Sequence, residues 1–557
     1  MKMKREDVRN VAIIAHVDHG KTTLVDQLLR QSGVFRANQE VVDRVMDSND
    51  IERERGITIL SKNTAVNYNG TKINIIDTPG HADFGGEVER VLKMVNGVIL
   101  LVDAYEGAMP QTKFVLRKAL ELDLPVIVCI NKIDRPEARP EEVVDEVLEL
   151  LMDLDASDEQ LDCPFLYASA RSGYAKKNLD DPNVDMQPLF QTILDYIPAP
   201  EGDPDAETQV LISTIDYNEY VGRIGVGKID NGYLKVNQDC VIVNHHEPDK
   251  FRKVKIGKLY EFEGLNKVEV QEAKIGSIVA ISGIADIHIG DTLCSPEKPE
   301  AIPFQKISEP TISMDFMVND SPLAGQEGKF ITSRHIRERL MRELNTDVSL
   351  RVEETDSADC FKVSGRGELH LSVLIENMRR EGFEFAVSKA EVLYKYDERN
   401  RKLEPMEIAY VDVPDDFTGA VIQKLTSRKG ELQGMSPIGS GYTRLEFSIP
   451  SRGLIGYRGE FMTDTKGNGI LNTSFDGYAP FKGELSYRKQ GSLIAFEAGE
   501  SITYGLFNAQ ERGTLFIGPG VKVYSGMIVG QSAKPEDIEL NVCKTKKLTN
   551  TRSSSAD

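Results

Sequence analysis

Residues 15–22 read Ala-His-Val-Asp-His-Gly-Lys-Thr and lie between two periodic segments. The preceding segment, 8–15, is a short apolar run of the kind that forms a buried parallel strand. From Lys21 onward, the aliphatic residues between Leu24 and Leu29 recur at the spacing of one helix face. The loop therefore ends at a helix N-terminus, where free backbone N–H groups and the helix dipole favour a bound phosphate.

The loop departs from the usual phosphate-loop pattern, G-x-x-x-x-G-K-[ST], at its first position. Ala15 stands where that pattern has glycine. Lys21 is expected to reach the β- and γ-phosphates, and the Thr22 hydroxyl to bind Mg²⁺. Taken alone, the stretch is also compatible with an ordinary strand-to-helix turn that contains an incidental Gly-Lys-Thr.

A second stretch, Asp77-Thr-Pro-Gly80, follows another apolar strand segment. A carboxylate at Asp77 would lie near Mg²⁺, and the Gly80 N–H near the γ-phosphate. His81 comes next and is the candidate catalytic residue, because phosphoryl transfer to water needs an oriented nucleophile more than a strong base. The alternative is a histidine that merely lies near the nucleotide.

A third stretch, Asn131-Lys132-Ile133-Asp134, favours guanine as the base. The Asp134 carboxylate can accept two hydrogen bonds from the guanine N1–H and N2 amine, which adenine does not offer. Sites built on such paired contacts reject the wrong partner by about 10⁴ to 10⁵. Ser169 and Ala170, after a further strand, would supply the last base contact.

These stretches, together with Arg55-Gly-Ile-Thr-Ile59, occur in the order found in the G domain of translational GTPases, which they resemble. That family admits alanine at the first loop position. The resemblance implies that the segment from Gly33 to Ile59 is switch I, ordered by the γ-phosphate, with Thr58 on Mg²⁺. It also implies that Val17 and Ile57 form an apolar gate in front of His81. The complete set of nucleotide-binding residues predicted here is Asp18, His19, Gly20, Lys21, Thr22, Thr23, Gly80, Asn131, Lys132, Asp134, Ser169 and Ala170, with Thr22, Thr58 and Asp77 on the metal.

The 557 residues suggest about three to five domains. Alternating strand and helix patterns predict a doubly wound α/β domain first, then a β-rich stretch that fits a small closed barrel. Two strand-helix-strand-strand-helix-strand units follow, the second with a helix near 454–465. The predicted fold is thus multidomain α/β and β: a P-loop GTPase domain (1–200), a β-barrel (207–303), two ferredoxin-like α+β domains (308–389 and 395–480) and a β-rich C-terminal domain (481–557).

The two repeated units resemble the third and fifth domains of elongation factor G, but no large insertion follows Asp134 and no long domain separates the units. Translocation itself is therefore disfavoured. Residues 499–513 and 541–550 resemble the C-terminal part of the BipA/TypA family of ribosome-associated GTPases, and this resemblance covers essentially the whole chain. Members of that family carry a further basic segment beyond 552–555, so we expect the C-terminal domain, which stops at Asp557, to be truncated.

Composition restricts the cellular context. The formal net charge of −21 argues at first against a nucleic-acid partner, but net charge governs solubility and steering, and local basic faces can still bind phosphate. Six cysteines lie far apart without a C-x-x-C pair, which is typical of a reduced cytoplasmic chain. No apolar run approaches 18 residues, so we expect neither a signal peptide nor a membrane span.

The resemblance implies a cytoplasmic, monomeric, GTP- and Mg²⁺-dependent factor that docks at the factor site of the bacterial ribosome and acts in 50S assembly or translation under stress. Because no residue of 1–200 stands out as an arginine finger, we expect slow intrinsic hydrolysis that the ribosome stimulates. One alternative is an rRNA-binding scaffold in which hydrolysis is incidental; another, a carrier of aminoacyl-tRNA, would be expected to lack the repeated pair of units. Candidate contacts to rRNA, with tRNA as a further partner, are Lys482, Arg488, Lys489, Lys544, Lys546, Lys547 and Arg552, plus Arg428, Lys429, Arg452 and Arg458, each of which could instead be a solvated surface charge.

Overall fold

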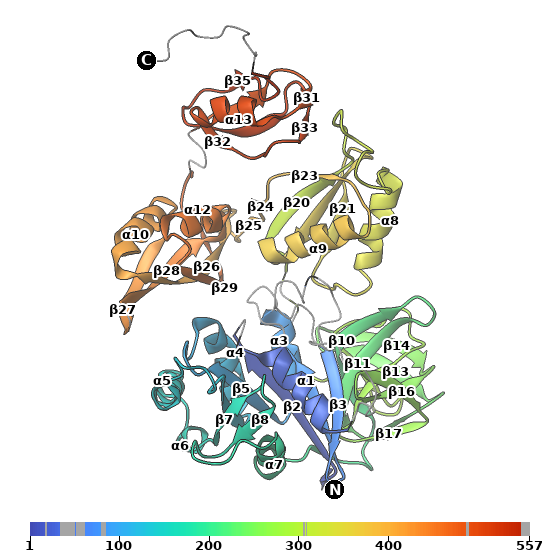
Figure 1. Cartoon of the computed structure of the whole chain (residues 1–557). Coiled ribbons are helices and arrows are strands. Elements are labelled where there is room, and N and C mark those ends of the chain that lie inside the picture. Colours follow the sequence, from blue (N-terminus) through green and yellow to red (C-terminus); the bar gives the residue numbers. More distant parts are fainter. Residues whose placement is uncertain are drawn as a thin grey trace, which may run out of the picture.

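The structure is a computed structural model of the chain, and five domains follow one another along it (Figure 1). Each domain has its own sheet and its own apolar core. The residues that the structure describes are 1–16, 19–33, 51, 62–78, 85–304, 307, 309–439, 441–485 and 490–546, with the backbone alone at 85–87, 89, 110, 111, 114, 438 and 439.

The first domain is built on a seven-stranded sheet in the order β3-β4-β2-β5-β6-β7-β8. Strands β4, β2, β5, β6 and β7 run parallel, and β3 and β8 pair antiparallel at the edges. The inner strands are rich in valine and isoleucine, as expected for strands covered on both faces. Their bounds are β2 (Val8–Ala15), β3 (Lys62–Tyr68), β4 (Thr71–Asp77), β5 (Gly97–Asp103), β6 (Val126–Asn131), β7 (Phe165–Ser169) and β8 (Tyr174–Lys176).

Helices cover both faces of this sheet. One core joins α1 and α7 to one face, and a second core joins α3, α4 and α5 to the other. Alternate residues of β2 enter the two cores, with Ile13 on one side and Ile14 on the other. This is the predicted doubly wound arrangement, which puts a ligand site at the carboxyl ends of the strands. The helices are α1 (Lys21–Gln31), α3 (Gly85–Leu92), α4 (Pro110–Glu121), α5 (Pro140–Asp153), α6 (Asp158–Leu161) and α7 (Gln187–Tyr196).

The second domain is an antiparallel β-barrel around one aliphatic core. Its main sheet has the order β14-β13-β19-β10-β11-β18-β15-β16, and a two-stranded ribbon, β12-β17, completes it. The strands are β10 (Gln209–Asn218), β11 (Gly222–Asn231), β12 (Tyr233–Lys235), β13 (Asp239–Asn244), β14 (Glu247–Lys255), β15 (Leu259–Glu263), β16 (Asn266–Val270), β17 (Glu272–Lys274), β18 (Ile278–Ile281) and β19 (Asp291–Cys294).

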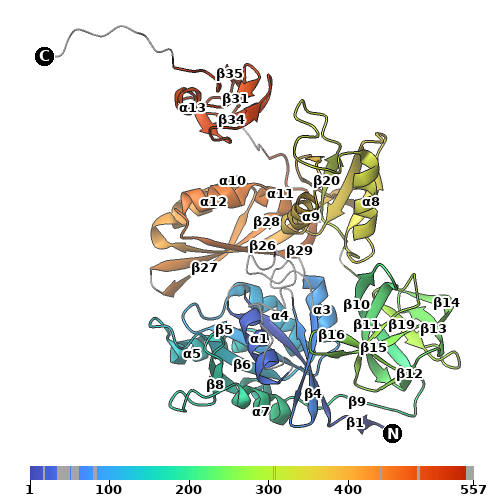
Figure 2. The ribbon, with the colours of Figure 1, turned by 45° about the vertical axis from the view of Figure 1, so that its right-hand side comes forward.

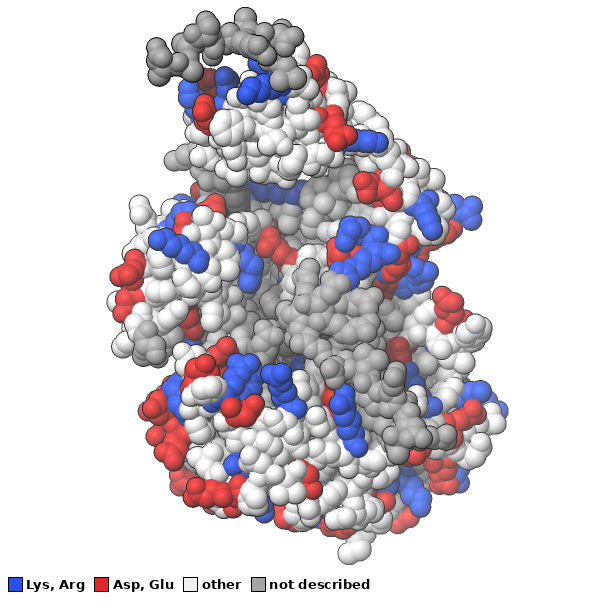
Figure 3. Space-filling view, viewed as in Figure 1, with Lys and Arg blue, Asp and Glu red and all other residues white. Residues whose placement is uncertain are grey.

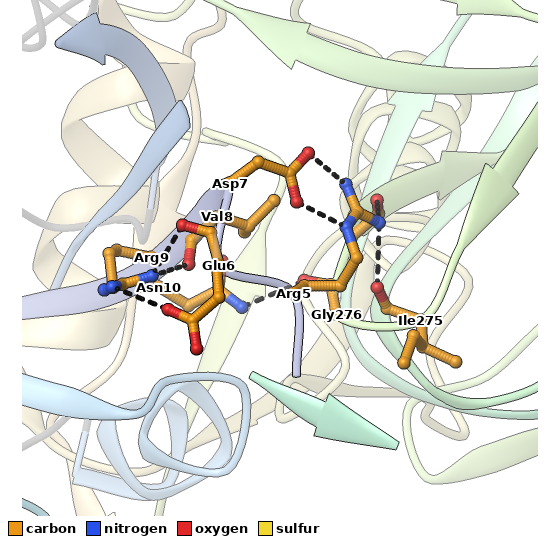
Figure 4. A network of polar contacts seen from close by, with 9 residues as sticks. Arg5, Glu6, Asp7, Val8, Arg9, Asn10, Ile275 and Gly276 are labelled. Atoms are coloured by element: carbon orange, nitrogen blue, oxygen red, sulfur yellow. Dashed lines mark hydrogen bonds and ion pairs between the residues drawn. The ribbon is translucent and has the colours of Figure 1, made fainter. Parts of the chain in front are cut away.

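Polar contacts and a shared core join the first two domains. Arg5 donates from Nη1 to the Ile275 carbonyl at 2.9 Å, and the buried Asn10 amide donates to the Gly276 carbonyl at 3.0 Å (Figure 4). A short ribbon of β1 (Met3–Lys4) and β9 (Glu201–Gly202) ties the N-terminus to the connection between the domains. Barrel side chains such as Phe262 belong to the same core as α3 and α4.

The third domain has the ferredoxin-like order. Its strands lie as β23-β20-β22-β21, which is the fourth, first, third and second strand of the unit. Helices α8 and α9 pack on this sheet in one core. The elements are β20 (Ile312–Met317), α8 (Ser333–Glu343), β21 (Arg351–Glu354), β22 (Cys360–Gly365), α9 (Glu368–Arg380), β23 (Ala386–Val387) and β24 (Glu391–Val392), which adds to β20.

The fourth domain repeats this order as β29-β26-β28-β27, and β29 contacts α4 of the first domain (Figure 2). The helix predicted near 454–465 is α12, Tyr457–Asp464, and a separate short helix, α11, precedes it. Gly456 adopts a left-handed φ of 74° between α11 and α12, which keeps the two helices apart. The elements are β25 (Lys395–Tyr396), β26 (Lys402–Pro414), the 3₁₀ turn η2 (Asp415–Phe417), α10 (Thr418–Ser427), β27 (Glu431–Gly439), β28 (Tyr442–Pro450), α11 (Ser451–Leu454), α12 (Tyr457–Asp464) and β29 (Ile470–Pro480).

The fifth domain is a small β-rich unit with one helix over a four-stranded sheet of order β32-β34-β30-β35. Together the five units confirm the predicted fold class. Among the described residues no helix is long and apolar enough to cross a membrane. The elements are β30 (Ser492–Ala495), β31 (Gly499–Glu500), α13 (Thr503–Gln510), β32 (Gly513–Leu515), β33 (Lys522–Val523), β34 (Ile528–Ser532) and β35 (Ile538–Leu540).

Candidate nucleotide-binding site

Three of the predicted stretches meet at one edge of the first sheet. Because β2, β4 and β6 are parallel, their last residues, Ala15, Asp77 and Asn131, lie at the same carboxyl edge. Lys21, in the first turn of α1, lies across this edge. Its Nζ is 3.1 Å from Asp77 Oδ1 and donates a hydrogen bond to the Thr78 carbonyl. Residues far apart in the sequence thus form one small polar site.

The loop backbone passes close to Asn131. Gly20 precedes α1 with a left-handed φ of 96°, and a Cβ there would lie 2.3 Å from Asn131 Nδ2. The same Nδ2 donates to the His19 carbonyl at 2.8 Å, while Asn131 Oδ1 accepts from the Ala170 N–H at 2.9 Å. Asn131 therefore holds the loop and the segment after β7 together, and glycine is required at position 20.

The base end of the site surrounds Asp134. This residue is exposed at the end of the Asn131–Asp134 stretch. Burial, together with the nearby charge of Asp134, raises the pKa of Tyr174 on β8. Ser169 and Ala170 are buried, and Ser169 Oγ accepts from the Ser172 N–H at 3.3 Å. An exposed carboxylate beside a fixed backbone turn is a suitable arrangement for the edge of a purine base.

The second residue of that stretch, Lys132, pairs with a carboxylate that the sequence reasoning missed. Its Nζ is 2.7 Å from Asp103 Oδ2. Asp103 Oδ1 accepts from the N–H groups of Tyr105 and Glu106 at 2.8 and 3.1 Å. Burial opposes ionisation of Asp103, but the hydrogen bonds from Lys132 and the two N–H groups bring its pKa below the ordinary value. Asp103 could have been identified from the sequence, because it is the last residue of β5 and the carboxyl end of β5 lies at the same edge of the sheet as the site.

The side chain of His19, a residue of the loop, is buried, with 1% of the residue exposed. Its Nδ1 accepts from the Asp103 N–H at 3.3 Å, and its Nε2 lies 3.1 Å from Glu106 Oε2. The hydrogen bond with His19 lowers the pKa of Glu106. Glu106 was not among the predicted residues either, because nothing in the loop sequence reveals its partner.

Thr22 and Asp77 have side-chain oxygens that could act as ligands of Mg²⁺. Magnesium takes hard oxygen ligands and is commonly held by one or two protein oxygens together with phosphate oxygens. Among the described residues no group of three or more His, Cys, Asp or Glu side chains could hold a metal by itself. A hydroxyl at the start of α1 and a carboxylate at the end of β4 therefore fit a metal that is shared with the phosphates. Thr23 lies beside Thr22 in the first turn of α1.

Several predicted residues lie outside the described part of the chain, so the structure does not place them. From the nucleotide site these are Val17, Asp18, Ile57, Thr58, Gly80 and His81, and from the basic candidates they are Arg488, Lys489, Lys547 and Arg552.

The described basic candidates differ in their environment. Lys544 and Lys546 are exposed, whereas Lys482 pairs with Glu431 at 2.7 Å. For Arg452 the prediction of an RNA-facing side chain is wrong. Arg452 is 3% exposed and pairs with the fully buried Glu404. Figure 3 shows acidic and basic side chains interspersed over one face of the molecule, so this face has no single sign of charge.

Four family models match the chain in sequence. The elongation factor Tu GTP binding domain matches residues 6–199, and elongation factor Tu domain 2 matches 222–294. The elongation factor G C-terminus matches 401–489, and the TypA/BipA C-terminal domain matches 490–557. These ranges correspond to the first, second, fourth and fifth domains of the structure.

Curated relatives match over nearly the full chain. A protein described as large ribosomal subunit assembly factor BipA from Synechocystis sp. is 56% identical over 550 residues, which cover 99% of this chain and 92% of that one. Proteins of the same description from Bacillus subtilis and Escherichia coli K12 are each 53% identical, covering 99% of this chain and 90% and 91% of theirs. The solved structure of ttk003000868 from Thermus thermophilus shares the fold, with a TM-score of 0.58 at 17% identity over 86% of this chain and 98% of that chain.

Proposed function

This chain belongs to the TypA/BipA family and is a translational GTPase that binds guanine nucleotide and hydrolyses GTP, and on that premise we propose that it binds ribosomal particles in its GTP form and acts in large-subunit assembly. The observation that carries the proposal is the identity of 53–56% to BipA proteins along 99% of the chain. In this proposal the factor is cytoplasmic, works as a monomer and serves translation under stress.

Within the site, we assign the phosphates to the loop and the first turn of α1. Gly20 brings the backbone N–H groups of the helix start close to the β-phosphate. Lys21 leaves Asp77 and the Thr78 carbonyl and pairs with the β- and γ-phosphate oxygens when GTP enters. Thr22 and Asp77, with Thr58, hold Mg²⁺, which neutralises charge on the phosphates when it is bound.

We assign the base to the Asn131–Asp134 stretch. Asp134 accepts the guanine N1–H and N2 amine, and Lys132 stays in place through Asp103. Ala170 lies beside the base in this assignment, and its N–H, which donates to Asn131 Oδ1 in the structure, would be shared with the base. In this assignment Asp18, His19, Thr23, Gly80 and Ser169 complete the nucleotide contacts.

His81 orients the attacking water in our proposal, and Val17 and Ile57 keep it away until the ribosome repositions it. A partner that accelerates hydrolysis by about 10⁵, as activators of small GTPases do, lowers the barrier by roughly 7 kcal/mol. The factor would therefore hydrolyse GTP slowly in solution and quickly on the particle.

The contact to rRNA, and to tRNA where one is present, is proposed to involve exposed basic residues of the fifth domain. Lys544 and Lys546 are exposed there, and the further candidates are Arg488, Lys489, Lys547 and Arg552. Each of these side chains that contacts an RNA phosphate should steepen the slope of log K against log salt concentration by somewhat less than one. Lys482 is a weaker candidate because Glu431 already neutralises it.

The proposal is tested by sedimenting the chain with large subunits and with whole ribosomes, in the presence of GDP or of a non-hydrolysable GTP analogue. We expect cosedimentation with the analogue and much less with GDP. Equal sedimentation with both nucleotides would refute binding in the GTP form.

His81→Ala separates this proposal from an rRNA-binding scaffold whose hydrolysis is incidental. An enzyme-timed factor should keep GTP binding in this variant but remain on the particle after GTP is added. A scaffold should leave the particle as the unchanged protein does.

A further inference from the structure

Glu106 lies outside the stretches that define the nucleotide site, yet its carboxylate reaches the phosphate loop. Glu106 Oε2 is 3.1 Å from His19 Nε2, on the side of the imidazole that faces away from the Asp103 backbone. The His19 side chain is 1% exposed, whereas the Glu106 side chain is 44% exposed. A surface carboxylate thus holds a buried side chain of the loop.

We propose that Glu106 is a positioning residue that fixes the phosphate loop through His19 and thereby sets the rate at which guanine nucleotide is released. The inference rests on the proposed assignment of the phosphates to this loop. It concerns release of the nucleotide rather than the chemistry of hydrolysis.

The hydrogen-bond pattern identifies the tautomer of His19. Its Nδ1 accepts the Asp103 N–H, so this nitrogen carries no proton. The proton of the neutral ring is therefore on Nε2, which donates it to the Glu106 carboxylate. The other groups near the ring are the His16 imidazole, whose centroid is 5.1 Å away, and the Asp103 carboxylate, which is engaged by Lys132.

The contact between Glu106 and His19 acts on the residue that directly precedes the left-handed Gly20. The His19 carbonyl is held by Asn131 Nδ2 at 2.8 Å, and its side chain is held by Glu106, so residue 19 is fixed on two sides. The next residue, Gly20, takes the left-handed φ of 96° that starts α1. Without Glu106, the His19 ring keeps the hydrogen bond from the Asp103 N–H and the loop keeps the contact to Asn131 Nδ2, but the Nε2 side of the ring is no longer held.

The segment that presents Glu106 is itself firmly held. The Gly107 N–H donates to the Asp103 carbonyl at 3.0 Å, which closes a tight turn around Glu106. Arg139, at the start of α5, donates from its N–H to the Ala104 carbonyl and from Nε to the Tyr105 carbonyl, both at 2.9 Å. Glu106 is therefore offered to His19 from a fixed position.

The same turn is connected to the base end of the site. Asp103 pairs with Lys132, which precedes the proposed base ligand Asp134 in the same short stretch. Arg139 follows this stretch in the sequence, and its Nε donates to the Tyr105 carbonyl of the turn. The turn 103–107 therefore joins the phosphate loop and the base-binding stretch, so loosening it should affect how both ends hold a nucleotide.

The test measures dissociation of a fluorescent GDP, N-methylanthraniloyl-GDP, from the full chain by chase with excess GDP at fixed Mg²⁺. For Glu106→Ala we expect release to be faster by roughly three- to tenfold, which is less than a buried hydrogen bond to a charged group would give, because the carboxylate is partly exposed. Glu106→Gln keeps an acceptor oxygen and should release at a rate nearer to that of the unchanged chain. Because the rate is measured on the bound population, partial misfolding does not imitate the effect.

Glu121→Ala is the matched control. Glu121 pairs with Lys118 near the end of α4 from a side chain that is 54% exposed, and among the described contacts it touches neither His19 nor the turn 103–107. We expect its release rate to be unchanged. A Glu106→Ala rate equal to that of the unchanged chain would overturn the inference, as would a Glu106→Gln rate as fast as that of the alanine variant. If the unchanged chain failed to bind the fluorescent GDP, the site assignment itself would fall, and the inference with it.

Discussion

Replacing Arg452 by alanine should destabilise the fourth domain much more than removing a surface charge would. Arg452 is the second residue of α11 and is 3% exposed, and its partner Glu404 on β26 is 0% exposed. Two guanidinium nitrogens donate to the two oxygens of this carboxylate. Arg452 Nη2 also donates to the Gly483 carbonyl at 2.6 Å, and the guanidinium lies 4.4 Å from the ring centre of Phe481.

The magnitude follows from what remains after the substitution. The Glu404 carboxylate would keep the hydrogen bond from the Lys482 N–H at 3.0 Å, and would otherwise be a buried charge without its counter-ion. Breaking a buried ion pair from one side costs about 3–5 kcal/mol. The segment from Phe481 to Gly483 would also lose one of its anchors, the hydrogen bond to the Gly483 carbonyl, so the connection to the fifth domain should loosen.

Because a chain of five domains does not unfold in two states, the assay is native-state hydrogen exchange of the β26 amides, since β26 pairs with β28 and β29. The control is Lys424→Ala, a side chain that is 40% exposed and pairs with Glu460 and Asp464, which are 47% and 22% exposed, and the expected change there is at most about 1 kcal/mol. The double variant Glu404→Leu with Arg452→Met removes both charges and should recover most of the loss. If Arg452→Ala changed the exchange free energy no more than Lys424→Ala does, the reasoning from burial would be refuted.

Two further substitutions test the nucleotide site. Asp134→Asn should shift the preference from GTP toward xanthosine triphosphate, because the amide complements the altered edge of that base; unchanged GTP affinity in a binding titration would contradict our assignment of the base. Gly20→Ala would place a Cβ 2.3 Å from Asn131 Nδ2 at a φ of 96°, with a strain of about 1–2 kcal/mol from the backbone alone, so we expect GDP affinity to fall by more than tenfold. A Gly20→Ala chain that binds GDP normally in equilibrium dialysis would show that the loop is not held as described.

Much of the fold could be predicted from local patterns. The central strands β5 and β6 read Gly-Val-Ile-Leu-Leu-Val-Asp and Val-Ile-Val-Cys-Ile-Asn, and the helices carry aliphatic residues on one face, so periodicity places them well. The two ferredoxin-like units follow from the order of their elements. The helix near 454–465 is present as α12, whereas the short helix α11 that precedes it, set apart by the left-handed Gly456, was not predicted.

The site was predictable only in part, for a physical reason. Lys21, Asp77 and Asn131 lie in short motifs whose spacing indicates their chemistry. Asp103 and Glu106 act through partners that are distant in the sequence, Lys132 and His19, and such pairs become visible only when the sheet brings them together. Similarly, the charge of Arg452 suggested a surface residue, but its buried partner Glu404 lies on the distant strand β26.

The most direct test is the GTP turnover of the purified chain, measured alone and with large ribosomal subunits or whole ribosomes. We predict slow turnover alone, on the order of 10⁻⁴ to 10⁻² per second, as in GTPases without an activator, and a rise by several orders of magnitude with the particles. Turnover of several per second without ribosomes, or no acceleration in their presence, would contradict a GTPase that the ribosome activates.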